Sequence, residues 1–148
     1  MSLFTLQNHP LNGPVINAGI VPSKQRQAAL KEAGKPVPQP QVVRALIDTG
    51  ASCSCVDPRH LTALGLSPTG TVQIHTPSND DEPTEHDQYD VGVVIVAGQG
   101  DHPLYLDTVP IVASSLEKQG IDALIGRDIL AGCVLVYNGK AGLFTLAF

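Results

Sequence analysis

The most informative stretch of this sequence is Ala45-Leu46-Ile47-Asp48-Thr49-Gly50-Ala51. Its three leading apolar residues predict the end of a buried strand. Gly50 lets the backbone turn tightly, so Asp48 stands at the end of that strand with its carboxylate on a turn. Such a turn can be purely structural, because Asp-Thr-Gly is favourable turn chemistry, or it can present the carboxylate for acid–base chemistry. The stretch alone supports both interpretations.

A second informative stretch is Ala123-Leu124-Ile125-Gly126-Arg127-Asp128-Ile129-Leu130. It combines apolar residues, a glycine and an Arg-Asp pair at the start of a predicted short helix. Between the two stretches, residues 69–76 and 89–97 predict the two arms of a long hairpin. The segment that joins these arms is strongly acidic, and residues 77–87 contain no glycine, lysine or arginine.

In order and approximate spacing, these features resemble the retropepsins, the retroviral-type aspartic proteases. The resemblance covers most of residues 40–148 and a first strand at 13–21, and it is closest to the bacterial and cellular members. It implies an all-β, closed retropepsin-type fold with one or two short helices, assembled as a twofold homodimer. It also implies an aspartic endopeptidase, in which a water molecule activated between the Asp48 carboxylates of two chains hydrolyses a polypeptide substrate.

The resemblance assigns roles to the residues around Asp48. Support of the active-site loop falls to Thr49, Gly50, Ala51, Gly126 and Arg127. Thr49 would join the loops of the two subunits through its hydroxyl group, and Gly126 would lie where only glycine fits beside the loop. Viral members pair the arginine with an acidic residue just after the motif, where this chain has Ser52. Asp128 is therefore expected either to cap the short helix or to pair with the arginine instead.

The long hairpin resembles the flap that closes over the substrate in this family. Its expected contacts with the substrate come from the end of the first arm, namely Ile74, His75, Thr76, Pro77 and Ser78. The segment beyond these residues departs from the glycine-rich viral tip. It is either an acidic tip that favours basic substrates or a solvated loop, and its composition favours the solvated loop for residues 80–85.

The two ends of the chain carry the same tetrapeptide, Leu-Phe-Thr-Leu, at residues 3–6 and 143–146. Each is too short and too apolar to stand alone as an exposed edge strand, which would invite aggregation. In a retropepsin, the termini of two subunits interleave into one small sheet. The resemblance therefore places the dimer interface at Leu3, Phe4, Leu6, Leu143, Phe144 and Leu146.

The remaining sequence indicates one domain, residues 1–148, that contains an insertion. Residues 23–33 are rich in helix formers, with Ser23 as a possible N-cap and Gly34 as a stop signal. The proline-rich residues 35–40 form a stiff linker. We expect this inserted helix and linker, at 23–40, to lie between the first two strands of the fold.

Composition argues against several other classes of protein. A net charge of −5 argues against a nucleic-acid binder. No apolar run approaches the roughly 18 residues of a membrane span. The three cysteines form no disulfide framework, so we expect a cytoplasmic setting. The histidines and cysteines show no spacing that predicts a metal site, and we expect no cofactor.

Two other interpretations of the sequence remain open. The same fold can serve as a non-catalytic dimerisation or peptide-binding module. A more remote alternative is redox or metal chemistry at Cys53 and Cys55. We expect the aspartic endopeptidase, which is the one interpretation that requires Asp48 to be ionisable and paired across a twofold axis.

Overall fold

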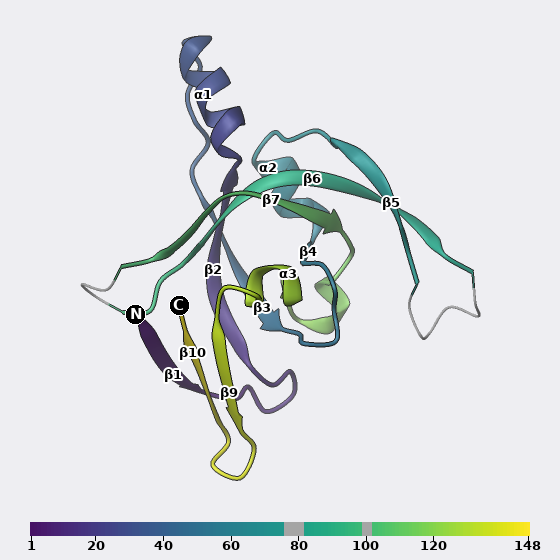
Figure 1. Ribbon diagram of the computed structural model, residues 1–148. Helices are drawn as coiled ribbons and strands as arrows, with labels where there is room; N and C mark the ends of the chain where they lie inside the picture. Colours follow the sequence, from purple (N-terminus) through teal and green to yellow (C-terminus); the bar gives the residue numbers. More distant parts are fainter. Residues whose placement is uncertain (76–81, 99–101) are drawn as a thin grey trace.

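The computed structural model describes residues 1–75, 82–98 and 102–148 (Figure 1). The strands are β1 (Leu3–Gln7), β2 (Val15–Pro22), β3 (Gln41–Ile47), β4 (Cys55–Val56), β5 (Gly70–Ile74), β6 (Thr84–Ile95), β7 (Leu104–Ala113), β8 (Ala123–Ile125), β9 (Val134–Asn138) and β10 (Leu143–Ala147). The helices are α1 (Lys24–Glu32), α2 (Pro58–Ala63) and α3 (Arg127–Leu130), and a 3₁₀ turn, η1, spans Glu117–Gln119. The predicted all-β class is confirmed, and β6 begins at Thr84, well before the expected residue 89.

Seven strands form a closed sheet around the main core. Their order is β2-β3-β8-β4-β7-β6-β5, and β2 also pairs with β6, which closes the sheet into a barrel. Inward-facing residues alternate along the strands, as in β3, where Val43, Ala45 and Ile47 are buried. Because the chain has no tryptophan and few other aromatic residues, this core is built mainly from aliphatic side chains.

One parallel pairing brings the two informative stretches of sequence together. β3 runs parallel to β8, with Ile47 opposite Ile125. Both strands end at the same level, so Asp48 and Gly126 follow them side by side. A Cβ atom on Gly126 would lie 2.7 Å from the carbonyl carbon of Cys53 and 2.8 Å from its oxygen. Backbone packs directly on backbone here, and only glycine fits.

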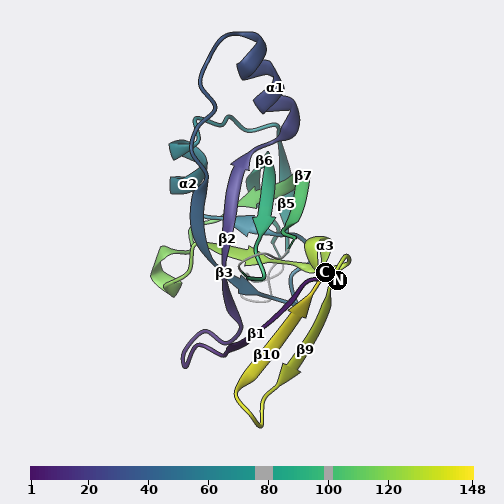
Figure 2. The ribbon, with the colours of Figure 1, turned by 90° about the vertical axis from the view of Figure 1, so that its left-hand side faces the viewer.

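The chain ends form a separate three-stranded sheet of order β1-β10-β9 (Figure 2). Phe4 lies opposite Leu146, and Leu6 lies opposite Phe144, so these four apolar side chains share one face of the sheet. Phe144 and Leu146 are 1% and 0% exposed, because they pack in the core of their own chain.

Within one chain, this sheet already pairs the two ends with each other. β10 is paired with β1 on one side and with β9 on the other, so neither of its edges is free for a strand of another chain. The β9–β10 hairpin supplies, within one chain, the neighbour that an interleaved partner would otherwise provide. Of the residues expected at the interface, Leu3 and Leu6 are exposed, Phe4 and Leu143 are half-buried, and Phe144 and Leu146 are buried.

Helix α1 lies in the segment where the sequence predicts an insertion, and it projects from the barrel (Figure 1). None of its side chains is buried, and it is held at its root by contacts with β7. The Lys24 ammonium group lies 2.8 Å from the Asp107 carboxylate, and the Thr108 hydroxyl donates to the Gln25 side chain at 2.6 Å.

Helix α2 depends on a buried carboxylate at its N-cap. Asp57 is 3% exposed and accepts hydrogen bonds from the amides of Arg59 and Leu116 and from the Arg59 guanidinium group. Burial alone raises the pKa of Asp57. The hydrogen bonds and the charge of Arg59 outweigh burial and bring that pKa down to about 2.

We predict that the Asp57→Asn substitution lowers the free energy of unfolding at pH 7 by about 2 kcal/mol. The ordinary pKa of an aspartate carboxyl group is 3.8, so the folded chain binds a proton at Asp57 less tightly than the unfolded chain does. The stabilisation is therefore present above pH ~4 and is lost as the pH falls toward ~2. Urea unfolding of both proteins across this range should show a difference in the free energy of unfolding that becomes smaller as the pH falls. A difference that does not change with pH would contradict a lowered pKa for Asp57.

We predict that Gly126→Ala lowers the free energy of unfolding by about 1–3 kcal/mol, because its methyl group has to displace backbone atoms. Gly70→Ala is the matched control, since a Cβ atom at that strand position meets nothing within 4 Å. The control should stay within about 0.5 kcal/mol of the unsubstituted chain in urea titrations. Equal unfolding midpoints for the two variants would show that the Cys53 backbone can move away from residue 126 without a loss of stability.

Candidate active site

Asp48 stands on a tight turn that directly follows β3. Its amide donates to the Ile125 carbonyl at 2.9 Å, and its own carbonyl accepts from the Ala51 amide at 3.2 Å. The Gly50 amide donates to the Oδ1 atom of the Asp48 carboxylate at 2.9 Å. A Cβ atom on Gly50 would lie 3.1 Å from that same oxygen, so glycine leaves this contact uncrowded. The turn orients the carboxylate and leaves Asp48 half-exposed.

Arg127 ties this turn to the start of α3. Its guanidinium group donates to the carbonyl oxygens of Thr49, at 2.9 Å, and Gly50, at 3.2 Å. Its amide donates to the Ala51 carbonyl at 2.9 Å. The arginine therefore holds the loop through backbone carbonyl groups instead of through an acidic side chain after the motif.

A network that the sequence reasoning missed fixes the segment after the turn. Asp128 accepts hydrogen bonds from the amide and the hydroxyl of Ser54, both at 2.8 Å. The Ser54 hydroxyl in turn accepts from the Gly126 amide at 2.9 Å. Asp128 also accepts from the Ile129 amide within α3, but the N-cap of this helix is Gly126 and no side chain caps it, so the expected helix cap is not formed. The alternative, an ion pair of Asp128 with Arg127, is not formed among the described residues either.

The only signal for Ser54 in the sequence is a hydroxyl group between two cysteines in a predicted strand. Ser54 is 1% exposed, so its polar atoms need partners inside the protein. A buried hydroxyl next to the Asp48 turn could have pointed to this network, but no sequence pattern names Asp128 as its partner.

Thr49 and Ala51 complete the turn. Thr49 is exposed, and its hydroxyl makes no hydrogen bond within the part of the chain that the structure describes. Ala51 is half-buried and lines the cavity beside Asp48. The Thr49 side chain, to which the resemblance assigns a contact with the partner loop, is therefore accessible at the surface.

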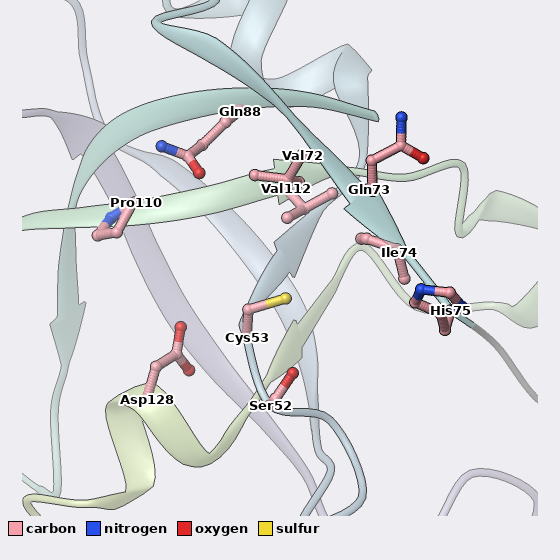
Figure 3. Close-up of a pocket in the computed structure, with 10 residues that line it drawn as sticks. All are labelled: Ser52, Cys53, Val72, Gln73, Ile74, His75, Gln88, Pro110, Val112 and Asp128. Atoms are coloured by element: carbon pink, nitrogen blue, oxygen red, sulfur yellow. The ribbon is translucent and has the colours of Figure 1, made fainter. Parts of the chain in front are cut away.

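Two adjoining cavities lie between this turn and β5. The inner cavity has a volume of about 480 Å³ and is lined by Asp48 and by apolar side chains that include Leu116 and Leu124. The outer cavity, of about 450 Å³, is drawn in Figure 3. The two cavities share Ser52, Cys53, Ile74 and His75, so they form one continuous cleft.

The end of β5 supplies one wall of this cleft. Ile74 and His75 line both cavities, whereas the other expected flap contacts, Thr76, Pro77 and Ser78, lie outside the described residues. His86 of β6 also lines the inner cavity, and its ring nitrogens lie 2.9 Å from the Thr84 hydroxyl and 3.2 Å from the Ala113 carbonyl. Sequence reasoning did not single out His86, because it assigned the start of β6 to a loop.

The two neighbouring cysteines differ in their surroundings. Cys53 is half-buried and lines both cavities, while Cys55 is buried. Burial, with smaller contributions from neighbouring acidic groups, raises the pKa of the Cys55 thiol to about 12. This thiol stays protonated at neutral pH and is a poor nucleophile or metal ligand, which counts against redox or metal chemistry at this position.

Comparison with known proteins adds an independent line of support. A family described as aspartyl protease matches residues 33–129, which is more than half of the chain. A crystal structure of a retropepsin-like aspartic protease from Rickettsia conorii aligns with a TM-score of 0.60 at 15% identity, covering 99% of this chain and 91% of that one. The solution structure of simian foamy virus (mac) protease aligns with a TM-score of 0.45 at 18% identity, covering 80% and 92%. No curated protein matches the chain.

The Rickettsia structure shares the fold over almost the whole chain, which confirms the expected retropepsin-like architecture. The family match spans the Asp48 turn and Gly126, the two segments that the parallel pairing of β3 and β8 brings together. The chain therefore belongs to the aspartyl protease family and is a retropepsin-like aspartic endopeptidase.

Proposed function

We propose that two copies of the chain form one active site, in which a water molecule between their Asp48 carboxylates attacks a peptide bond of a polypeptide substrate. One observation carries this proposal: among the described residues, Asp48 is the single carboxylate that lines the inner cavity. Hydrolysis by this chemistry needs one ionised and one protonated carboxylate. A second chain, related to the first by a twofold axis, supplies the missing group.

In this arrangement the ionised Asp48 removes a proton from the water molecule. The protonated carboxyl group of the partner's Asp48 donates a hydrogen bond to the substrate carbonyl oxygen. Two carboxylates about 3 Å apart do not both ionise readily, which keeps one proton on the pair. The Gly50 amide donates a hydrogen bond to Oδ1 of Asp48. The Oδ2 atom of Asp48 accepts no hydrogen bond within the described part of the chain, so it is open to water.

We assign supporting roles to the residues around this pair. The exposed Thr49 hydroxyl binds the loop of the partner subunit, while Arg127 and Gly126 fix the loop within its own chain. Ile74 and His75 contact the bound substrate from the flap side of the cleft. The same role is proposed for residues 76–78, which lie outside the described ranges.

We place the dimer interface on the outer strands of the terminal sheet. Half of the exposed large apolar side chains in the described part of the chain lie on β1 and β9: Leu3, Leu6, Val134, Val136 and Tyr137. The outer edges of β1 and β9 have no strand partner among the described residues. A second chain packed here buries apolar surface and covers an edge that would otherwise invite aggregation.

We also assign the protein to a reducing, cytoplasmic setting, because Cys53, Cys55 and Cys133 are free thiols. No helix in the described ranges is long and apolar enough to cross a membrane. The net charge of −5 favours a polypeptide over a nucleic acid as the binding partner.

We predict that Asp48→Asn lowers the rate of peptide cleavage by roughly 10²–10⁴-fold, because an amide cannot take a proton from water. Cleavage of a fluorogenic peptide library measures the rate, and sedimentation should show the same assembly as the unsubstituted chain. Asp87→Asn, an exposed position on β6 outside both cavities, is the control and should keep full activity. Retained cleavage by Asp48→Asn would exclude the proposed mechanism.

We predict that Val136→Glu converts the protein to inactive monomers. Each dimer would lose two buried valines, worth about 3 kcal/mol or more together, so the dissociation constant should rise by at least roughly a hundredfold. Val96→Glu is the matched control, because Val96 is 57% exposed, Val136 is 55% exposed, and Val96 lies outside the terminal sheet. Analytical ultracentrifugation and thermal melts decide the outcome. A folded variant that still sediments as a dimer would place the interface elsewhere.

A further inference from the structure

A third cavity continues the cleft away from Asp48. Its volume is about 590 Å³, and it shares Pro110 and Asp128 with the outer cavity. In Figure 3, Ile74 and His75 lie at one end of the outer cavity, and Pro110 and Asp128 lie at the other. The surface therefore offers one path that starts at Asp48, passes β5 and reaches the root of α1.

The third cavity lies along the edge of a strand. All six consecutive residues from 105 to 110 of β7 line it. Side chains of a strand alternate between its two faces, so a cavity that touches six in a row must follow the strand edge. β7 pairs with β6 on one side, and on its other side it pairs with β4 only at Val112 and Ala113. Among the described residues, the edge from 104 to 110 thus has no strand partner.

Apart from histidines, the acidic and basic side chains that line this path are all aspartates among the described residues. Asp107 and Asp128 line the third cavity, and no lysine or arginine lines any of the three cavities among the described residues. Lys24 pairs with Asp107 at 2.8 Å, but the two side chains are 71% and 50% exposed. An exposed pair of this kind is weak, so another cation can replace Lys24 at low cost.

We propose that the β7 edge is an exosite for the substrate, in which the segment flanking the cleaved bond binds as an added strand and places a lysine or arginine near Asp107 and Asp128. Backbone hydrogen bonds to a free strand edge give affinity to any extended peptide, and side-chain pockets give it specificity. The proposal rests on the proposed function in taking the cavity at Asp48 as the place of cleavage and in taking the dimer as twofold. The twofold axis repeats the exosite, so each end of the substrate meets one copy.

Binding to the inactive Asp48→Asn protein tests the exosite apart from catalysis. The probes are two fluorescein-labelled peptides of about twenty residues, long enough at ~3.3 Å per residue to pass the cleft at both ends. They share one Val-Leu-Phe-rich core and differ only in their flanks, which carry two lysines on each side in one peptide and two glutamates in the other. Fluorescence anisotropy at low ionic strength gives both dissociation constants.

We expect the lysine peptide to bind about five- to tenfold more tightly than the glutamate peptide. Adding Asp107→Asn should lower this ratio, because Asp128 is then the one carboxylate left in the third cavity among the described residues, and adding Lys24→Gln should raise it, because Lys24 no longer competes with the peptide lysine for Asp107. The matched control is Asp87→Asn, which removes the same charge from an exposed position outside the three cavities and should leave the ratio unchanged.

Three results would overturn the exosite: no binding of either peptide, equal dissociation constants, or an equal loss of preference in Asp107→Asn and Asp87→Asn. The last result would mean a general attraction to an acidic surface. Cleavage of the same peptides by the unsubstituted chain is measured separately. A clear binding preference without any cleavage would count against the proposed function and leave the exosite standing.

Discussion

The parallel pairing of β3 with β8 is the constraint on which the candidate active site depends. It ends both strands at one level and lays the Asp48 turn on the backbone of Gly126, where no side chain fits. Hydrogen bonds then fix the turn from two sides. Arg127 binds its carbonyl groups, and Ser54 links the following segment to Asp128. The carboxylate is thus oriented by backbone packing, which tolerates little displacement.

The terminal sheet pairs the two ends of the chain with each other inside one chain. Because β1 and β9 of the same chain lie on the two sides of β10, the apolar residues of β10 stabilise the single chain. The proposed interface therefore uses the outer strands, β1 and β9. In that proposal, folding and association depend on different residues: a substitution at an exposed residue of β9 changes the assembly, whereas one in β10 first disturbs the core.

The site could be predicted from sequence where short patterns have strict physical consequences. An apolar run, an aspartate and a glycine specify the Asp48 turn, whereas the place of Gly126 beside that turn was implied by the resemblance to the retropepsins. The neighbours of the terminal strands could not be predicted, since alternation indicates which side chains share a face but not which strand lies beside them. The start of β6 was missed because its polar residues have the composition of a loop. The Ser54–Asp128 contact joins residues 74 positions apart, a distance over which no local pattern extends.

The proposed active site shared by two chains is tested most directly by mixing the unsubstituted chain with an equal amount of Asp48→Asn chain and allowing subunits to exchange. Random pairing leaves about one dimer in four with two Asp48 carboxylates, so cleavage activity should fall to about a quarter of that of the unsubstituted protein at the same total concentration. A fall to about one half would mean that each chain works alone, and it would contradict an active site built from two Asp48 residues.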